Sequence, residues 1–195
     1  MPLILGIAGK MGAGKNLIAS ILEERGWRTL DLDSLAHQIL DQNAVVIESE
    51  FGSEVIDAEG KINRRSLGAK VFNCPPLLRK LESITYPLIE RETLGWLAAD
   101  TSVSVAIHAI NLHKTALPQR CDAILWVHAS RRQRRKRVMA RDGRPWNEIK
   151  ARFKSQNKLK PKLFSPYAET YSIKNSGNLG RTRHRLEEIL CHIEG

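Results

Sequence analysis

The chain has 195 residues, 42% hydrophobic and 27% charged, as expected of a globular protein with one domain and an elaboration. It contains no run of 18 apolar residues, no basic segment ahead of its apolar start, and three cysteines without metal-binding spacing. We therefore expect a cytoplasmic protein with no membrane span. The net charge of +10 favours polyanionic partners, either nucleic acid or substrates that carry several phosphates.

The start of the chain predicts a strand, a turn, a helix and a second strand. Residues 3–8 form a short apolar run that is typical of a strand buried on both faces of a parallel sheet. A glycine-rich turn at 9–14 follows, and residues 16–25 have apolar side chains at helical spacing before a stop at Gly26. A second strand is expected at 28–32, so the chain opens with a βαβ unit.

The middle of the chain predicts mostly helix. Helices are expected at 34–40, 65–72, 76–84 and 88–98, with prolines near the starts of the last two. We interpret residues 34–99 as a helical insertion beside the sheet.

The last part of the chain returns to alternating strands and helices. Strands are expected at 102–110, 123–127 and 171–173, and helices at 130–141, 146–158 and 179–193. Residues 158–166 are basic and interrupted by prolines, which predicts a loop or mobile flap. This alternation indicates a doubly wound α/β sheet.

Residues 9–16, GKMGAGKN, match the phosphate-loop pattern G-x-x-x-x-G-K. Gly12 and Gly14 let the backbone wrap closely around an anion, so that successive N–H groups form a nest. The helix that begins near Lys15 adds its positive end, and Lys15 reaches the β- and γ-phosphates. Because a strand precedes the loop and a helix follows it, we favour a nucleotide site over a chance glycine turn.

Asn16 departs from this pattern, which has Ser or Thr at that position. The hydroxyl normally binds Mg²⁺. An amide oxygen is also a ligand that Mg²⁺ accepts, although the side chain is longer. The sequence therefore predicts binding of ATP with Mg²⁺ at Asn16 and leaves the rate of turnover open.

Two carboxylates stand where the second strand is expected to end. Asp31 and Asp33 are two residues apart, so on a strand both point the same way. One can hold a magnesium-bound water and the other can accept a proton from a hydroxyl. His37 lies one helical turn beyond Asp33. The alternative is a helix-capping aspartate and a solvated histidine.

The series of motifs resembles bacterial dephospho-CoA kinases over nearly the whole chain. The matching segments, in the family's order, are LGIAGKMGAGK, DLDSLAH, FGSEVIDAEGKINRRSLGAKVF, LESITYPLIERE, VMARDG and IKNSG. The resemblance implies an α/β fold: a P-loop three-layer αβα core with a parallel sheet, a helical insertion at about 34–99 that binds the substrate, and a lid at about 140–166. It also implies transfer of phosphate from ATP to the ribose 3′-hydroxyl of dephospho-CoA, the last step of coenzyme A biosynthesis.

The resemblance further implies roles for single residues. Asp33 would be the general base, and Lys15 would contact the transferred phosphate. Arg141 in the lid would approach the phosphates, and Asn175 would lie near the adenine. The full set expected to hold ATP is Gly12, Ala13, Gly14, Lys15, Asn16, Leu17, Arg141 and Asn175. The set expected on the acceptor side is Asp31, His37, Arg64 and Arg65.

The chain departs from the family pattern around magnesium and the acceptor. Besides Asn16, His108 occupies a strand end that often carries an acid, and Lys114 stands where an acid is common. Tyr86-Pro87 replaces the usual His-Pro pair. These changes bear on catalytic efficiency and on the exact substrate more than on the fold.

Residues 131–137, RRQRRKR, are the densest charge in the chain. They are interpreted as a solvated helix that leads into the lid, with a phosphate-gripping role or contact with nucleic acid as alternatives. Nucleic acid is not the favoured partner, since no binding motif or stacking platform accompanies the run.

The expected partners are ATP and dephospho-CoA, and the protein is expected to be a monomer or weak homo-oligomer. Two alternative functions stay open: a kinase for another nucleoside or nucleotide, and a nucleotide-binding protein with little catalysis.

Overall fold

The computed structural model describes residues 1–72, 74–143 and 145–195. Its contacts divide the chain into two compact units, one formed by Met1–Asp31 with Asp100–Gly195 and the other by Leu32–Ala99. Residue 144, within the expected lid, lies outside the described residues. None of the helices in the described ranges is both long enough and apolar enough to cross a membrane.

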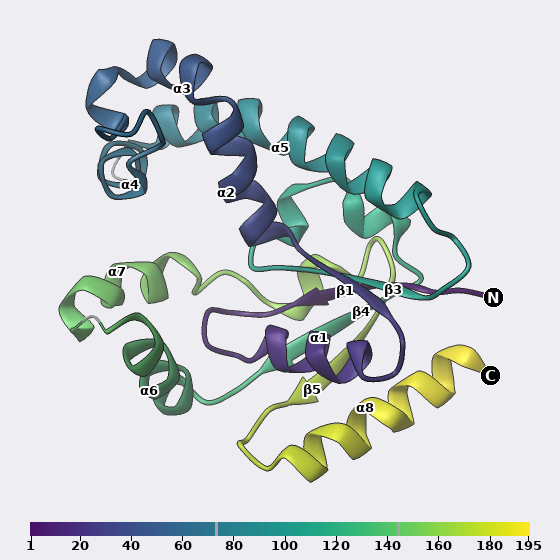
Figure 1. Cartoon of the computed structure of the whole chain (residues 1–195). Helices are drawn as coiled ribbons and strands as arrows, with labels where there is room; N and C mark the ends of the chain where they lie inside the picture. The colour runs from purple at the N-terminus through teal and green to yellow at the C-terminus, as the bar shows by residue number, and fades with distance from the viewer. Residues whose placement is uncertain (73, 144) are drawn as a thin grey trace. The chain divides into compact units, whose positions relative to one another are not determined.

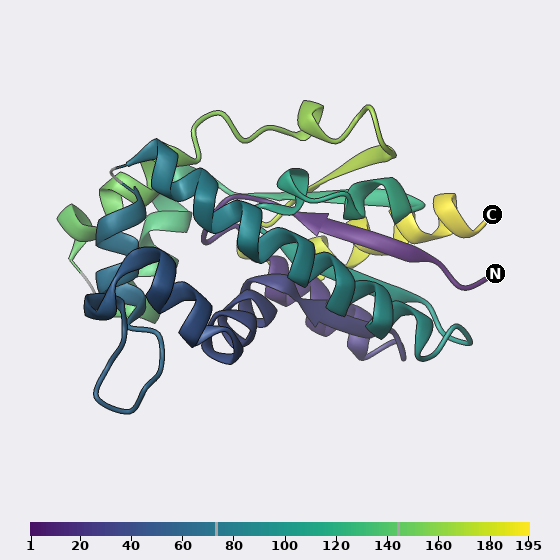
Figure 2. The same cartoon turned by 90° about the horizontal axis from the view of Figure 1, so that it is seen from above.

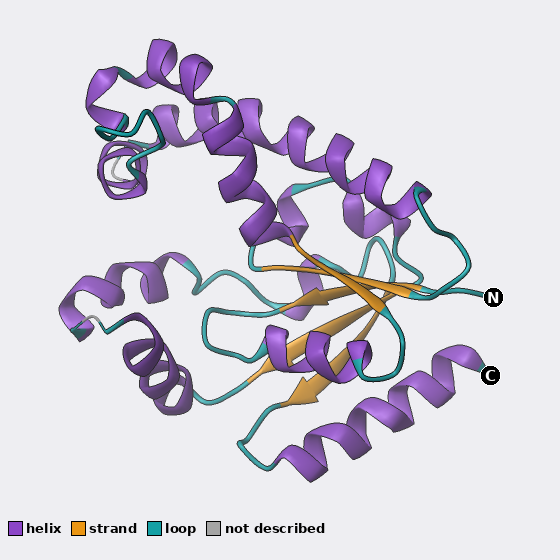
Figure 3. Cartoon of the chain, in the orientation of Figure 1, coloured by secondary structure: helices purple, strands orange, loops and turns teal. Residues whose placement is uncertain are grey.

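The first unit contains a five-stranded parallel sheet (Figures 1 and 3). The strand order is β2-β3-β1-β4-β5, which places β1 at the centre. The bounds are β1 Ile4–Ala8, β2 Arg28–Asp31, β3 Val105–Ala109, β4 Ala123–His128 and β5 Glu169–Lys174. The predicted α/β fold with a parallel sheet is confirmed. As the apolar pattern of residues 3–8 predicts, β1 is almost entirely buried.

One face of the sheet is covered by α1 (Lys15–Glu23) and α8 (Leu179–Glu194). Ile18 and Leu22 of α1 and Leu186 and Leu190 of α8 are fully buried in this layer. Burying a side chain of this size contributes about 1.5–3 kcal/mol. This layer therefore fixes the start of α1, and with it the loop that connects β1 to α1.

The other face of β1 is packed without a side chain at Gly6. A Cβ there would lie 2.4 Å from Cδ1 of Ile124, with Leu112 and Cys121 also within 3.1 Å. These neighbours belong to β4 and to the short helical turns η2 (Leu112–Lys114) and η3 (Leu117–Arg120), the latter followed directly by Cys121. Gly6 thus permits close packing at the centre of the sheet.

Helices α6 (Arg131–Asp142) and α7 (Trp146–Ser155) follow β4. A capping box between Ser130 and Gln133 starts α6, and Gly143, with φ of 62°, ends it. The two helices pack through a small buried cluster that also includes the phosphate loop: Met11, Val138, Ile149 and Phe153.

Residues 158–166 contain anchored side chains and a turn, η4 (Pro161–Leu163). Phe164 is fully buried, with its ring centroid 6.3 Å from that of Trp126 on β4. Leu159 is also buried. The segment is thus mainly a loop, one of the two expected alternatives, and its two buried apolar side chains pack onto the core.

The second unit is helical: α2 (Leu32–Gln42), α3 (Ala44–Phe51), η1 (Ser53–Val55), α4 (Arg64–Phe72) and α5 (Pro75–Ala98). Its core is formed by Ile47, Phe51, Val55, Ile62, Leu67 and Val71. Figure 2 shows the loop between α3 and α4 extending away from the helices, and a bridge between Ile56 and Ile62 closes it.

The sequence prediction was wrong at two places in this unit. Two helices, at 76–84 and 88–98, were expected on either side of Pro87, but α5 is continuous. A proline removes only one helical N–H, and the buried Thr85 and Ile89 on both sides of it hold the helix in the core. Helix α3 was not predicted, since its apolar residues lack a clear helical stripe.

Candidate active site

The loop between β1 and α1 needs glycine at two positions. Gly12 and Gly14 have φ of 75° and 103°, in the left-handed region. A Cβ on Gly14 would lie 2.0 Å from Nδ2 of Asn175, and a Cβ on Gly12 would lie 2.7 Å from the carbonyl oxygen of Arg134. Both the backbone conformation and the lack of space therefore require glycine, and the loop follows the path that the motif predicts.

Lys15 is the first residue of α1 and is 7% exposed. Lysine is rarely buried to this extent without an anionic or polar partner. Here the side chain lies at the positive end of a nine-residue helix, next to backbone N–H groups that have no helical acceptor. The start of α1 is thus a place where a phosphate is strongly favoured.

The outer side of the loop is held by Asn175 and Arg137. Asn175 follows β5, is 3% exposed, and donates from Nδ2 to the carbonyl of Ala13 at 3.0 Å. Arg137 donates from Nη1 to the carbonyls of Gly12 and Ala13 at 3.3 and 3.2 Å, and from Nη2 to the carbonyl and Oδ1 of Asn175, both at 3.2 Å. The carbonyls of Gly12 and Ala13 are thus satisfied on this side of the loop, and the N–H of Ala13 donates to the carbonyl of Lys10 at 2.9 Å.

The first half of the loop has its own supports. Gln156, just after α7, accepts from the backbone N–H of Met11 at 2.8 Å. Arg134 donates to the carbonyl of Met11 at 3.3 Å and lies 4.9 Å from the ring centroid of Phe153. Helices α6 and α7 therefore help to shape the loop.

A cavity of about 290 Å³ lies beside the second half of the loop. It is lined by Gly14, Leu17, Arg137, Asn175, Gly177 and Leu179. Three residues predicted to hold ATP, namely Gly14, Leu17 and Asn175, thus come together around one space.

Arg141 lies elsewhere on α6. Its Nε donates to the carboxylate of Asp142 at 2.6 Å, and its side chain is 66% exposed. Arg137, one turn earlier, and Arg134 are the arginines of α6 that donate hydrogen bonds to the loop. Sequence reasoning identified the basic run but did not single out Arg134 and Arg137, because nothing in RRQRRKR shows which side faces the loop.

Other members of the basic run pack on an aromatic ring. The guanidinium groups of Arg131 and Arg135 lie 5.9 and 4.7 Å from the ring centroid of Trp146 on α7. These contacts join α7 to α6. Four arginines of the run thus have roles within the protein, which weakens the interpretation of a wholly solvated helix.

The end of β2 brings Asp31 next to a histidine. Asp31 pairs with His108 across β2 and β3, and its Oδ1 lies 3.7 Å from Nδ1 of His108, which is 4% exposed. The expectation that Asp33 continues this strand and points with Asp31 is wrong. The strand ends at Asp31, and Asp33 lies in the first turn of α2.

Helix α2 presents its polar candidates at intervals of four residues. Asp33, His37 and Asp41 share one face of the helix. The carboxylate of Asp41 accepts from Arg64 at 2.5 Å and from the backbone N–H of Ile62 at 3.3 Å. Arg65 and His37 are exposed. The structure therefore orients Arg64 through Asp41, a residue that the prediction missed although the interval 33, 37, 41 indicates it.

Tyr86 was noted as a departure from the family pattern around the acceptor, but the sequence analysis gave it no role. Burial raises the pKa of its hydroxyl, and the nearby carboxylates of Glu82 and Asp33 raise it further. The hydroxyl donates to Glu82 at 3.3 Å. A protonated phenol thus lies in the electrostatic neighbourhood of Asp33, both residues belonging to the second unit.

The residues present fit a magnesium ion that is held mainly by nucleotide phosphates. Among the described residues, no group of three His, Cys, Asp or Glu side chains is placed to hold a metal ion. Mg²⁺ in phosphoryl-transfer sites takes one or two protein oxygens, phosphate oxygens and water. Asn16, exposed on the first turn of α1, and Asp31 offer such oxygens.

A glycine-rich loop between the central strand of this parallel sheet and a helix is typical of P-loop nucleotide-binding proteins. A family profile described as dephospho-CoA kinase matches residues 3–180. The chain belongs to the dephospho-CoA kinase family. The dephospho-CoA kinase of Bdellovibrio bacteriovorus is 33% identical over 196 residues, which cover 97% of this chain and 96% of that protein.

Solved structures show the same fold. A crystal structure from Thermus thermophilus has a TM-score of 0.82 and 29% identity, with coverage of 100% of this chain and 99% of that one. The dephospho-CoA kinase from Campylobacter jejuni has a TM-score of 0.63 and 24% identity, again covering 100% and 99%.

Proposed function

We propose that the protein transfers the γ-phosphate of ATP to the ribose 3′-hydroxyl of dephospho-CoA, giving CoA and ADP. The observation that carries this proposal is the loop at residues 9–15, with its outward carbonyls satisfied and Lys15 buried at the start of α1, in a chain of this family. This arrangement suits the β- and γ-phosphates of a nucleotide. The cavity beside Gly14, Leu17 and Asn175 suits the adenosine.

In this reaction the 3′-oxygen attacks the γ-phosphorus while the bond to the β–γ bridging oxygen breaks. The proton of the hydroxyl goes to the carboxylate of Asp33, and ADP leaves. Lys15 and the backbone N–H groups of Gly12 and of residues 14–16 stabilise charge on the phosphates.

On the acceptor side we assign His37, Arg64 and Arg65 of the helical unit, together with Asp31 at the end of β2. Arginine forks match phosphate geometry, and Arg64 is already oriented by Asp41. We assign the exposed Arg141 to the phosphates of bound ATP in a closed lid.

Magnesium supplies charge neutralisation on the phosphates when it is bound with ATP. We propose that the amide oxygen of Asn16 contributes to holding it. Replacing Asn16 with Ser or Thr then maintains or raises turnover, since the hydroxyl suits octahedral geometry better. A sharp fall in turnover would assign the amide a role of its own.

The central test is an ADP-release assay with ATP, magnesium and dephospho-CoA. We expect ADP release that depends on dephospho-CoA, with the new phosphate on the 3′-oxygen by phosphorus NMR. In Lys15→Ala the rate falls about 10²–10³-fold, because a preorganised positive charge is lost. ADP release with another nucleoside or nucleotide but none with dephospho-CoA would transfer the proposal to that acceptor.

We further propose that the enzyme works in the cytoplasm as a monomer or weak homo-oligomer. Light scattering coupled to size exclusion measures the mass in solution directly against the 22.0 kDa of one chain.

A further inference from the structure

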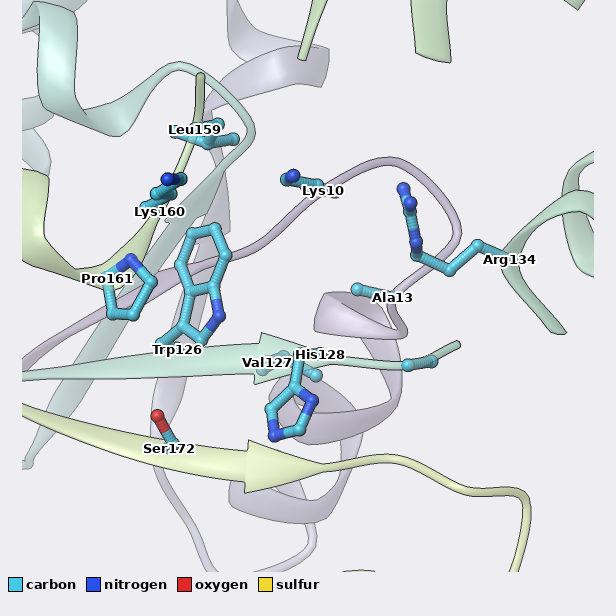
Figure 4. Close-up of a pocket in the computed structure, with 11 residues that line it drawn as sticks. Lys10, Ala13, Trp126, Val127, His128, Arg134, Leu159, Lys160, Pro161 and Ser172 are labelled. Atoms are coloured by element: carbon cyan, nitrogen blue, oxygen red, sulfur yellow. The ribbon is translucent and has the colours of Figure 1, made fainter. Parts of the chain in front are cut away.

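A second cavity, of about 430 Å³, lies beside the first half of the phosphate loop (Figure 4). Its walls come from the loop at Lys10, the end of β4 at Trp126 and His128, helix α6 at Arg134, and the segment after α7 at Lys160. It shares no lining residue with the cavity beside Gly14, Leu17 and Asn175. The two cavities are therefore separate.

The charged side chains that line this second cavity are all basic. Lys10, Arg134 and Lys160 line it, and none of its eleven lining residues carries a carboxylate. Burial lowers the pKa of Lys10, and the positive charges of Arg134 and Lys160, which line the same cavity, lower it further. A bound anion relieves the repulsion between these positive charges.

The cations have donors to offer to a ligand. Arg134 uses one N–H of Nη1 for the carbonyl of Met11, and a guanidinium has five N–H donors. The Nζ of Lys10 lies 3.5 Å from the carbonyl oxygen of Asn157, and an ammonium group has three N–H donors. These same contacts position Lys10 and Arg134 at the wall of the cavity.

The remaining wall is apolar and aromatic. Trp126, Leu159 and Pro161 line it, and the first two are buried. Figure 4 shows the Trp126 ring between Pro161 and the loop, with the side chains of Lys10 and Lys160 near its upper edge. A ligand that fits both walls combines a phosphate with an apolar or flat group.

We propose that this cavity is a second anion site, which binds a phosphate or diphosphate ester while the phosphate loop holds its nucleotide. Two sources offer that chemistry: the diphosphate of the acceptor itself, and a separate phosphorylated effector. The first source rests on the proposed function, whereas the anion site as such does not.

The binding experiment uses the whole protein saturated with ADP, so that the phosphate loop is filled, and inorganic pyrophosphate as the probe. We expect calorimetry to show a further binding event in the ADP-loaded protein. In Lys160→Ala its affinity falls about tenfold or more, because a hydrogen bond between charged groups is lost. Lys160→Arg restores most of the affinity.

Lys162→Ala is the matched control, since Lys162 is an exposed lysine two residues away that does not line the cavity. Its affinity stays within about twofold of the original protein. Thermal melting checks that each variant is folded. No further binding event in the ADP-loaded protein, or equal affinity in the Lys160 and Lys162 variants, overturns the proposal.

Kinetics then distinguish the two sources. If the KM for dephospho-CoA rises about tenfold in Lys160→Ala while the KM for ATP is unchanged, the acceptor's own diphosphate occupies the cavity. If both KM values are unchanged while pyrophosphate binding is lost, the ligand is a separate effector. Failure of the kinase assignment is recognised independently, because the unaltered protein then releases no ADP with dephospho-CoA, whereas the binding result stands.

Discussion

The phosphate loop and the polar face of α2 differ in the contacts that hold their candidate residues in place. The loop is held by buried contacts from residues more than 120 positions away, such as Arg137 and Asn175. The face of α2 presents Asp33, His37 and Asp41 at intervals of four residues, at least partly open to solvent, and its contacts with Ile62 and Arg64 come from within the helical unit. The loop is therefore sensitive to changes in distant packing, whereas α2 should tolerate them and respond mainly to changes in its own side chains.

The largest effect should come from Asp33→Asn. An amide cannot accept the proton of the 3′-hydroxyl, so kcat should fall about 10²–10⁴-fold. The KM for ATP and the melting temperature should change little, because Asp33 lies in the helical unit and is only half-buried. Rapid-quench measurement of CoA formation gives kcat, and a kcat close to that of the unaltered enzyme would remove Asp33 from the role of base.

The next effect tests the loop. Gly14→Ala places a methyl group within 2.0 Å of Asn175 Nδ2 and strains a φ of 103°. We expect a loss of about 3 kcal/mol of stability and about 100-fold weaker ATP binding. Gly26→Ala is the control, since Gly26 also has a positive φ, of 82°, but nothing lies within 4 Å of the place that its new methyl group would take. It should cost about 1–2 kcal/mol and leave ATP affinity unchanged.

A third test separates two arginines of one helix. Arg137→Ala removes donors to Gly12, Ala13 and Asn175, so both the melting temperature and ATP affinity should fall, the latter about tenfold. Arg141→Ala should lower kcat and leave the melting temperature unchanged, because its side chain is exposed in this structure. The reverse pattern, in which Arg141→Ala destabilises the fold, would contradict both assignments.

The smallest effect concerns Asp41. Its ion pair with Arg64 is partly exposed, and such pairs contribute about 0–1 kcal/mol. Asp41→Asn should raise the KM for dephospho-CoA by a few-fold through a less well oriented Arg64. The double variant with Arg64→Ala should be no worse than Arg64→Ala alone, and additive losses would show that the two residues act separately.

Local patterns were enough to predict much of the fold and part of the site. The G-x-x-x-x-G-K motif located the loop, because its chemistry requires adjacent residues. The roles of Arg134 and Arg137 were not accessible, since seven consecutive polar residues hide which of them face the loop. Strand β2 ends at Asp31, one residue earlier than predicted, so Asp33 lies in a helix and not beside Asp31 on a strand. Pro87 led to the prediction of two separate helices, but tertiary packing keeps α5 continuous.

The hydrogen bonds that Arg137 donates to the loop and to Asn175 also restrict where the lid can bend. A hinge at the start of α6 would separate this arginine from the loop and from Asn175, and would break the hydrogen bond that Gln133 donates to the carbonyl of Ser176 at 2.6 Å. Each such bond contributes about 0.5–1.5 kcal/mol, so swinging α6 as a rigid arm is costly. Helix α6 up to Arg137 therefore behaves as part of the frame that holds the phosphate loop, and the contacts of Phe153 with Arg134 and of Trp146 with Arg135 join α7 to the same frame.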